Sequence, residues 1–72
     1  MPFNPTKFYP RIIENLKREG YEKVSRTRLE VEIIRTLGVV TPKTINRNIQ
    51  VLEKLGYIER EEENRDVWII KG

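Results

Sequence analysis

Three glycines divide the chain into segments of similar character. Gly20, Gly38 and Gly56 each follow a stretch in which apolar residues recur every three or four positions. That spacing is typical of an amphipathic helix, and a glycine just past the last turn can adopt the left-handed conformation that ends it. The sequence therefore predicts three helices, which in a chain of 72 residues belong to a single domain.

The first predicted helix covers residues 10–19. Pro10 suits its first turn, because proline lacks the N–H that a first-turn position leaves unpaired. The apolar face of this segment consists of Phe8, Ile12, Ile13 and Leu16. Residues 1–9 precede the helix and carry prolines at positions 2 and 5. We therefore expect an N-terminal arm over residues 1–9 and the folded domain over residues 10–72.

A short extended piece is expected over residues 22–25, with Val24 pointing inward. The second helix is expected to begin after Thr27 and to end at Gly38. Thr27 and Glu30 have the spacing of a capping box, in which the threonine hydroxyl accepts from the backbone N–H of the glutamate and the glutamate reaches back.

The third predicted helix covers residues 42–55. Thr41 is a good N-cap and Pro42 a good first helical residue. The apolar stripe of this helix consists of Ile45, Ile49, Leu52 and Leu55. The opposite face carries Lys43, Arg47, Gln50 and Lys54, with Asn46 at its flank. The helix is therefore amphipathic, and its outer face is basic and amide-bearing.

After Gly56 the apolar period changes to two, as in a β-strand. We expect strands over residues 57–60 and 67–70, joined by a polar turn over residues 61–64 into a β-hairpin. Aromatic residues in the hairpin of so small a domain are more often core than stacking platforms for nucleic acid, so Tyr57 and Trp68 are expected in the core. The order of helix, short strand, helix, turn, helix and hairpin indicates an α+β fold.

Histidine and cysteine are both absent from the sequence. Their absence removes the commonest general base and the commonest metal ligands. There is no Gly-rich phosphate loop and too little volume for a closed pocket, so we expect no enzyme, no cofactor, no metal site and no small-molecule ligand. No apolar run reaches membrane-spanning length and residues 1–10 lack the apolar core of a signal peptide. We therefore expect a cytoplasmic, nucleoid-associated protein.

Positive charge is concentrated in the first part of the chain. Residues 1–56 hold 11 basic and six acidic side chains, whereas residues 57–72 hold three basic and five acidic ones. A basic body with an acidic end suits a nucleic-acid partner that is reached from one side. An ordinary solvated surface is the alternative interpretation.

Three segments resemble the winged helix–turn–helix superfamily. They read IIRTLGV at 33–39, TPKTINRNI at 41–49 and LEKLGYI at 52–58. The resemblance implies three helices, a short strand before the second helix and a C-terminal β-hairpin, the wing. The size, the isoleucine content and the charge also resemble stand-alone winged-helix regulators of archaea and of their viruses and plasmids, and the composition fits a thermophile.

The sequence departs from the family pattern at two places. The turn over residues 38–41 is about one residue longer than the usual turn of the family, which can change the angle of the third helix. The predicted wing tip carries Glu61, Glu62 and Glu63, where wings that enter a minor groove carry Arg or Lys. Phosphate would repel these three carboxylates.

The resemblance implies that the third helix enters the major groove of DNA. On its outer face Arg47 can donate twice to guanine, while Asn46 and Gln50 can each pair with adenine through two hydrogen bonds. The residues expected at phosphates or base edges are Thr41, Lys43 and Thr44 on the third helix, Arg26 and Arg28 at the start of the second, and Arg65 in the wing.

The sequence and the family resemblance are compatible with two functions. The first is a transcriptional regulator that binds double-stranded DNA sequence-specifically, and the second is a protein-interaction module whose acidic wing docks a basic partner. A domain of this size covers one short half-site and buries a small core, so we expect a homodimer. The expected interface consists of Phe3, Phe8, Tyr9 and Ile13, although the same side chains can instead cover the core of their own subunit.

Overall fold

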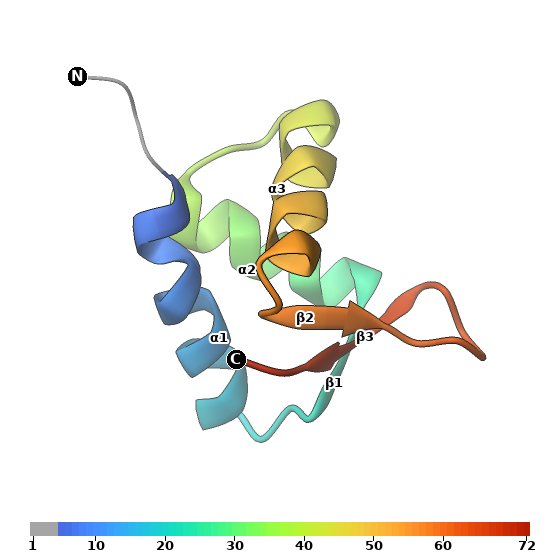
Figure 1. Cartoon of the computed structure of the whole chain (residues 1–72). Coiled ribbons are helices and arrows are strands. Elements are labelled where there is room, and N and C mark those ends of the chain that lie inside the picture. Colours follow the sequence, from blue (N-terminus) through green and yellow to red (C-terminus); the bar gives the residue numbers. More distant parts are fainter. Residues whose placement is uncertain (1–4) are drawn as a thin grey trace.

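The structure, a computed structural model, describes residues 5–72. Within that range it contains three α-helices and one three-stranded antiparallel sheet (Figure 1). The elements are η1 (Pro5–Phe8), α1 (Tyr9–Arg18), β1 (Lys23–Ser25), α2 (Arg26–Leu37), α3 (Pro42–Lys54), β2 (Ile58–Arg60) and β3 (Val67–Ile70). The predicted α+β class and element order are confirmed, and the arrangement is compatible with a winged helix.

The three glycines that follow the predicted helices all have positive φ angles, as expected for residues that end helices. The values are 90° at Gly20, 72° at Gly38 and 84° at Gly56. At Gly38 the residue is the left-handed C-cap of α2, and its N–H donates to the Ile34 carbonyl at 2.9 Å. A side chain at this φ would be strained, so glycine is the residue that the helix end requires.

The N-terminal boundary of α1 differs from the prediction. Residues 5–8 of the expected arm form the 3-10 turn η1, and α1 begins at Tyr9 rather than Pro10. Pro10 still lies in the first turn of α1, where its missing N–H leaves no helical hydrogen bond unmade. The remainder of the arm predicted over residues 1–9, residues 1–4, lies outside the described residues.

The start of α2 also differs from the prediction, and the capping box at Thr27 is wrong. The helix begins at Arg26, and its N-cap is Ser25, whose hydroxyl accepts from the Arg28 N–H at 3.3 Å. The pairing of β1 with β3 decides this boundary, because the Arg26 N–H donates to the Asp66 carbonyl at 2.8 Å. The chain leaves the sheet at that bond, so the residue just before it becomes the cap.

The sheet has the strand order β1-β3-β2, with both pairs antiparallel. Val24 of β1 faces Trp68 of β3 in the register and is buried, as predicted. The hairpin of β2 and β3 is confirmed, but its loop is longer than the four residues expected. Asn64 explains the extension, because its side chain accepts from the Asp66 N–H at 3.0 Å and its carbonyl accepts from the Val67 N–H at 3.1 Å.

One hydrophobic core joins the helices to the sheet. Trp68 is fully buried, with 0% of its surface exposed, and Tyr57 is half-buried, so the expectation that these rings belong to the core is met. The buried hydrophobic residues are Tyr9, Ile12, Ile13, Leu16, Val24, Leu29, Ile33, Leu37, Ile45, Ile49, Leu52, Ile58 and Trp68. The core therefore uses all three helices and all three strands.

No helix in residues 5–72 is long and apolar enough to cross a membrane.

Candidate nucleic-acid interface

The outer face of α3 is a row of exposed polar side chains. Ile45, Ile49 and Leu52 turn one side of the helix into the core, whereas Leu55, predicted on the same stripe, is the C-cap and is 55% exposed. Helix geometry then directs Lys43, Asn46, Arg47, Gln50 and Lys54 outward, and all five are exposed. Thr44 is half-buried beside them. The residues of α3 that are predicted to contact bases or phosphates thus share one accessible surface.

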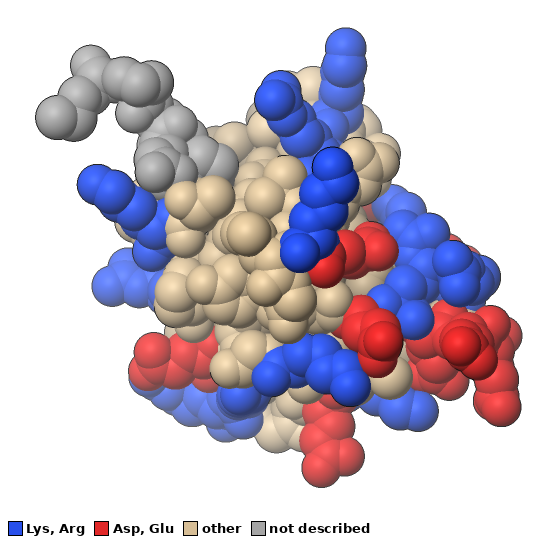
Figure 2. Space-filling model, in the orientation of Figure 1, with Lys and Arg blue, Asp and Glu red and all other residues tan. Residues whose placement is uncertain are grey.

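The positive charge on this face is not compensated by the protein. Among residues 5–72, Lys43, Arg47 and Lys54 take part in no ion pair. Figure 2 shows Lys and Arg side chains projecting around α3, whereas acidic side chains gather toward the hairpin loop. An anion that approaches α3 therefore meets three basic side chains that no carboxylate in residues 5–72 pairs with.

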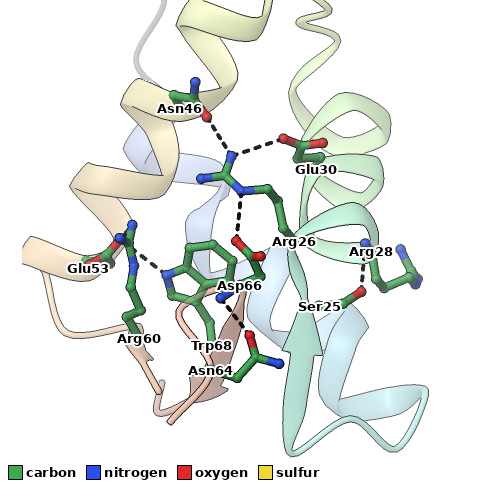
Figure 3. Close-up of polar contacts among 10 residues, drawn as sticks. All are labelled: Ser25, Arg26, Arg28, Glu30, Asn46, Glu53, Arg60, Asn64, Asp66 and Trp68. Carbon is green, nitrogen blue, oxygen red and sulfur yellow. Dashed lines mark hydrogen bonds and ion pairs between the residues drawn. The ribbon is translucent and has the colours of Figure 1, made fainter. Parts of the chain in front are cut away.

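The single carboxylate of α3 is turned away from that face. Glu53 Oε1 accepts from Arg60 Nη2 and from Trp68 Nε1, both at 3.2 Å. Both donors belong to the sheet, so Glu53 ties α3 to the hairpin (Figure 3). Its charge is balanced by Arg60, which leaves the outer face of α3 basic.

The N-terminus of α3 is only partly capped. Thr41 is the N-cap and Pro42 the first helical residue, as predicted, but the Thr41 side chain makes no capping hydrogen bond. The first turn of α3 also contains no acidic residue. Lys43 therefore lies near the positive end of the helix dipole with no carboxylate to offset it, an arrangement that an external anion would stabilise.

A buried hydrogen-bond chain fixes α3 against α1. Tyr9 Oη donates to Asn48 Oδ1 at 2.6 Å, and Asn48 Nδ2 donates to the Thr44 carbonyl at 2.8 Å. Asn48 is 5% exposed and was not singled out from the sequence. Its place three residues after Ile45, on the apolar stripe, is the signal that could have identified it as buried.

Arg26, predicted at a phosphate, lies at the start of α2 and beside α3. Its Nη1 lies 3.0 Å from Asn46 Oδ1 and 3.4 Å from Glu30 Oε2, and its Nε lies 3.9 Å from Asp66 Oδ1 (Figure 3). The guanidinium also lies 5.5 Å from the centre of the Trp68 ring. The side chain therefore already has several protein partners.

Arg28 is held in a different cluster, away from Asn46 (Figure 3). It forms ion pairs with Glu19 and with the buried Glu32, and its guanidinium lies over the Tyr21 ring. The hydrogen bond to Glu19 raises the pKa of Arg28 above its ordinary value. With its side chain 18% exposed and engaged by two carboxylates, Arg28 has little capacity left for a phosphate. Glu32, which is buried and pairs with Arg28, was not singled out from the sequence.

The hairpin loop presents both signs of charge. Arg65 is exposed and, within the described range, forms no ion pair. Glu61 is paired with Lys23 at 3.3 Å, whereas Glu62 and Glu63 are exposed. Arg65 thus remains available to a ligand, next to two carboxylates that would repel an anion.

The residues expected at a dimer interface do not form a common exposed surface. Tyr9 and Ile13 are 1% and 3% exposed because both pack into the core of their own chain. Neither can contact a second copy in this conformation. Phe8 is half-buried against that core, and Phe3 lies outside the described residues.

Residues 5–72 contain no group of three or more His, Cys, Asp or Glu side chains that could hold a metal ion. A scan against protein-family models and a search of curated proteins each found no match to this chain.

Proposed function

We propose that this chain is a winged helix–turn–helix domain that binds double-stranded DNA sequence-specifically and serves as a transcriptional regulator. In this proposal α2 and α3 form the helix–turn–helix, α3 lies in the major groove, and the hairpin of β2 and β3 is the wing. The element order and the three-stranded antiparallel sheet are compatible with that fold. The family resemblance of residues 33–58 supports it independently.

The observation that carries the proposal is the uncompensated basic and amide face of α3. Lys43 and Arg47 are exposed and unpaired in the described part of the chain, while Glu53 is turned toward the sheet. An α-helix fits the major groove, where Arg47 can donate twice to guanine O6 and N7 and Gln50 can pair with adenine. Lys43 and the first-turn N–H groups of α3 are suited to a phosphate.

The experiment that tests this proposal compares alanine substitutions at two exposed arginines. A random duplex pool selects the preferred site, and fluorescence anisotropy then measures affinity over a salt series. We expect log K to fall linearly with log salt concentration, with a slope of about 0.9 per neutralised phosphate. Arg47→Ala should weaken the selected site, whereas Arg11→Ala, on the outer side of α1, should leave it unchanged. Selection of no duplex, or equal effects of both variants, would contradict the proposal.

The second candidate function is a protein-interaction module. Its support is the exposed pair Glu62 and Glu63 at the hairpin loop, which a basic partner could contact. In that case duplex affinity should be weak and independent of sequence, and replacement of the basic face of α3 should not change binding of the protein partner. The same salt series therefore separates the two candidates.

A homodimer is part of the proposed mode of action, because one reading helix supplies few base contacts. With Tyr9 and Ile13 in the protomer core, Phe8 is the described member of the predicted interface that is still partly accessible. Figure 2 shows mostly uncharged surface between α1 and the lower part of α3. Such a surface would bring few like charges into direct contact when two copies pair.

A further inference from the structure

Arg26 connects three parts of the molecule that meet at the proposed interface. Its guanidinium contacts Asn46 of α3, Glu30 of α2 and Asp66 of the hairpin loop, and it lies over the Trp68 ring of β3 (Figure 3). The side chain is 40% exposed. Two carboxylates and one ring therefore surround it next to a residue of α3.

The chemistry of this contact determines which way the Asn46 amide faces. A guanidinium has only donors, so the group that lies 3.0 Å from Arg26 Nη1 must be the amide oxygen of Asn46. The amide nitrogen consequently points away from Arg26 (Figure 3). Asn46 itself is exposed. A ligand that approaches Asn46 from the side opposite Arg26 therefore meets its amino group.

We propose that Arg26 is a positioning residue that sets the base preference of Asn46, and that the pair selects guanine over adenine. This inference rests on the proposed DNA-binding function. In the major groove, guanine presents two acceptors, N7 and O6, whereas adenine presents the acceptor N7 and the donor N6. An amino group can donate to N7 of either purine, but at the 6-position it meets the acceptor O6 in guanine and the donor N6 in adenine.

The adenine contact expected from the sequence needs the opposite arrangement. An asparagine pairs with adenine by donating to N7 while its oxygen accepts from N6. Here that oxygen is directed at Arg26, so the adenine N6 would have to share it with a guanidinium through its second lone pair. Without Arg26 the Asn46 amide could rotate about the Cβ–Cγ bond and present its oxygen and its nitrogen together to one base. Adenine would then compete with guanine.

The contacts of Arg26 also argue against its predicted role as a phosphate ligand. Glu30 and Asp66 lie within 3.4 Å and 3.9 Å of its guanidinium nitrogens and offset its charge. A phosphate would have to compete with both carboxylates. Arg26 therefore acts on DNA through Asn46, which is a role that the spacing of the sequence does not reveal.

The test compares substitutions at two arginines that lie over the same tryptophan. Arg26→Met keeps an unbranched stem near Trp68 but cannot donate to Asn46, whereas Arg26→Lys keeps a charged donor. Arg60→Met is the matched control for base preference, because Arg60 lies 5.1 Å from the centre of the Trp68 ring and bonds Glu53 rather than Asn46. Loss of its ion pair with Glu53 acts on the affinity for all four bases alike, so the ratio between bases is compared. Circular dichroism melting establishes that each variant is folded at the assay temperature.

The readout is base preference at one position of the selected duplex. Loss of preference in Asn46→Ala identifies that position, and anisotropy then gives the affinity for each of the four bases. We expect the unmodified protein and Arg60→Met to prefer guanine. Arg26→Met should lower the guanine-to-adenine ratio by about tenfold, the size of one well-formed base contact, and Arg26→Lys should restore most of it.

Three results would contradict the assignment, and one of them is specific to the proposed function. A preference of the unmodified protein for adenine at this position would refute the amide orientation. An equal loss of affinity for all four bases in Arg26→Met would make Arg26 a phosphate ligand instead. Selection of no duplex at all would remove the proposed DNA-binding function and the base preference with it.

Discussion

Replacement of Tyr9 by Phe tests the buried hydrogen bond that attaches α1 to α3. The Tyr9 side chain is 1% exposed, and its hydroxyl donates to Asn48 Oδ1 at 2.6 Å. Asn48 Nδ2 is already used, since it donates to the Thr44 carbonyl. Removal of the hydroxyl would leave the Asn48 oxygen without a donor at a place that is shielded from water.

The expected loss follows from that unpaired oxygen. A buried polar group without a partner costs about 1–3 kcal/mol, and the aromatic ring that Phe retains keeps the apolar contacts of the site. We therefore expect the free energy of unfolding to fall by about 2 kcal/mol. In a domain of this size that loss lowers Tm by roughly 8–16 °C.

The pH dependence of stability gives a second readout of the same residue. Burial raises the pKa of Tyr9 above the 10.0 of a free tyrosine. Below pH 10 both folded and unfolded chains keep this proton, so its contribution is fully present. As pH rises above 10, the unfolded chain releases the proton before the folded one does, and stability is lost. Tyr9→Phe lacks this loss, so the gap between variant and unmodified protein should narrow above pH 10.

Urea unfolding followed by circular dichroism measures both effects, with Tyr57→Phe as the control. The Tyr57 ring packs edge-on against Tyr9 with 6.1 Å between ring centres, but in the described part of the chain its hydroxyl makes no hydrogen bond. Loss of that hydroxyl should change stability by less than about 0.5 kcal/mol. Equal effects of the two substitutions, or a Tyr9→Phe loss below about 0.5 kcal/mol, would show that the Tyr9–Asn48 hydrogen bond does not stabilise the fold.

Three further outcomes are expected. Arg47→Ala should lower affinity for the selected duplex by about 1–3 kcal/mol and relax preference at one base pair, without loss of helicity; unchanged anisotropy titrations would remove Arg47 from the reading residues. Replacement of Glu61–Glu63 by glutamine should strengthen nonspecific binding and steepen its salt dependence, and weaker binding would mean that a carboxylate contacts DNA. Sedimentation at micromolar concentration should give twice the 8.6 kDa of one chain, and the monomer mass in Phe8→Asp; a monomer mass at all accessible concentrations would eliminate the homodimer.

Local patterns in the sequence were sufficient for the order of the α-helices and strands and for the outer face of α3, but not for the starts of α1 and α2. The spacing of apolar residues predicted three helices and the hairpin, because backbone geometry converts a period of 3.6 or 2 into a buried face. The glycines that follow the helices predicted their ends, because few other residues tolerate positive φ. The same helical geometry turned Lys43, Arg47 and Gln50 outward once Ile45 and Ile49 were assigned to the core.

Contacts between distant segments were decided only by the tertiary structure. Tyr9 and Asn48 are 39 positions apart and Arg26 and Asn46 are 20 apart, so no local period relates them. The pairing of β1 with β3 moved the start of α2 to Arg26. Which carboxylate neutralises an arginine, and which way an amide faces, depend on the elements that pack beside it. For that reason the residues of the basic face could be named from the sequence, whereas the orientation of Asn46 within it could not.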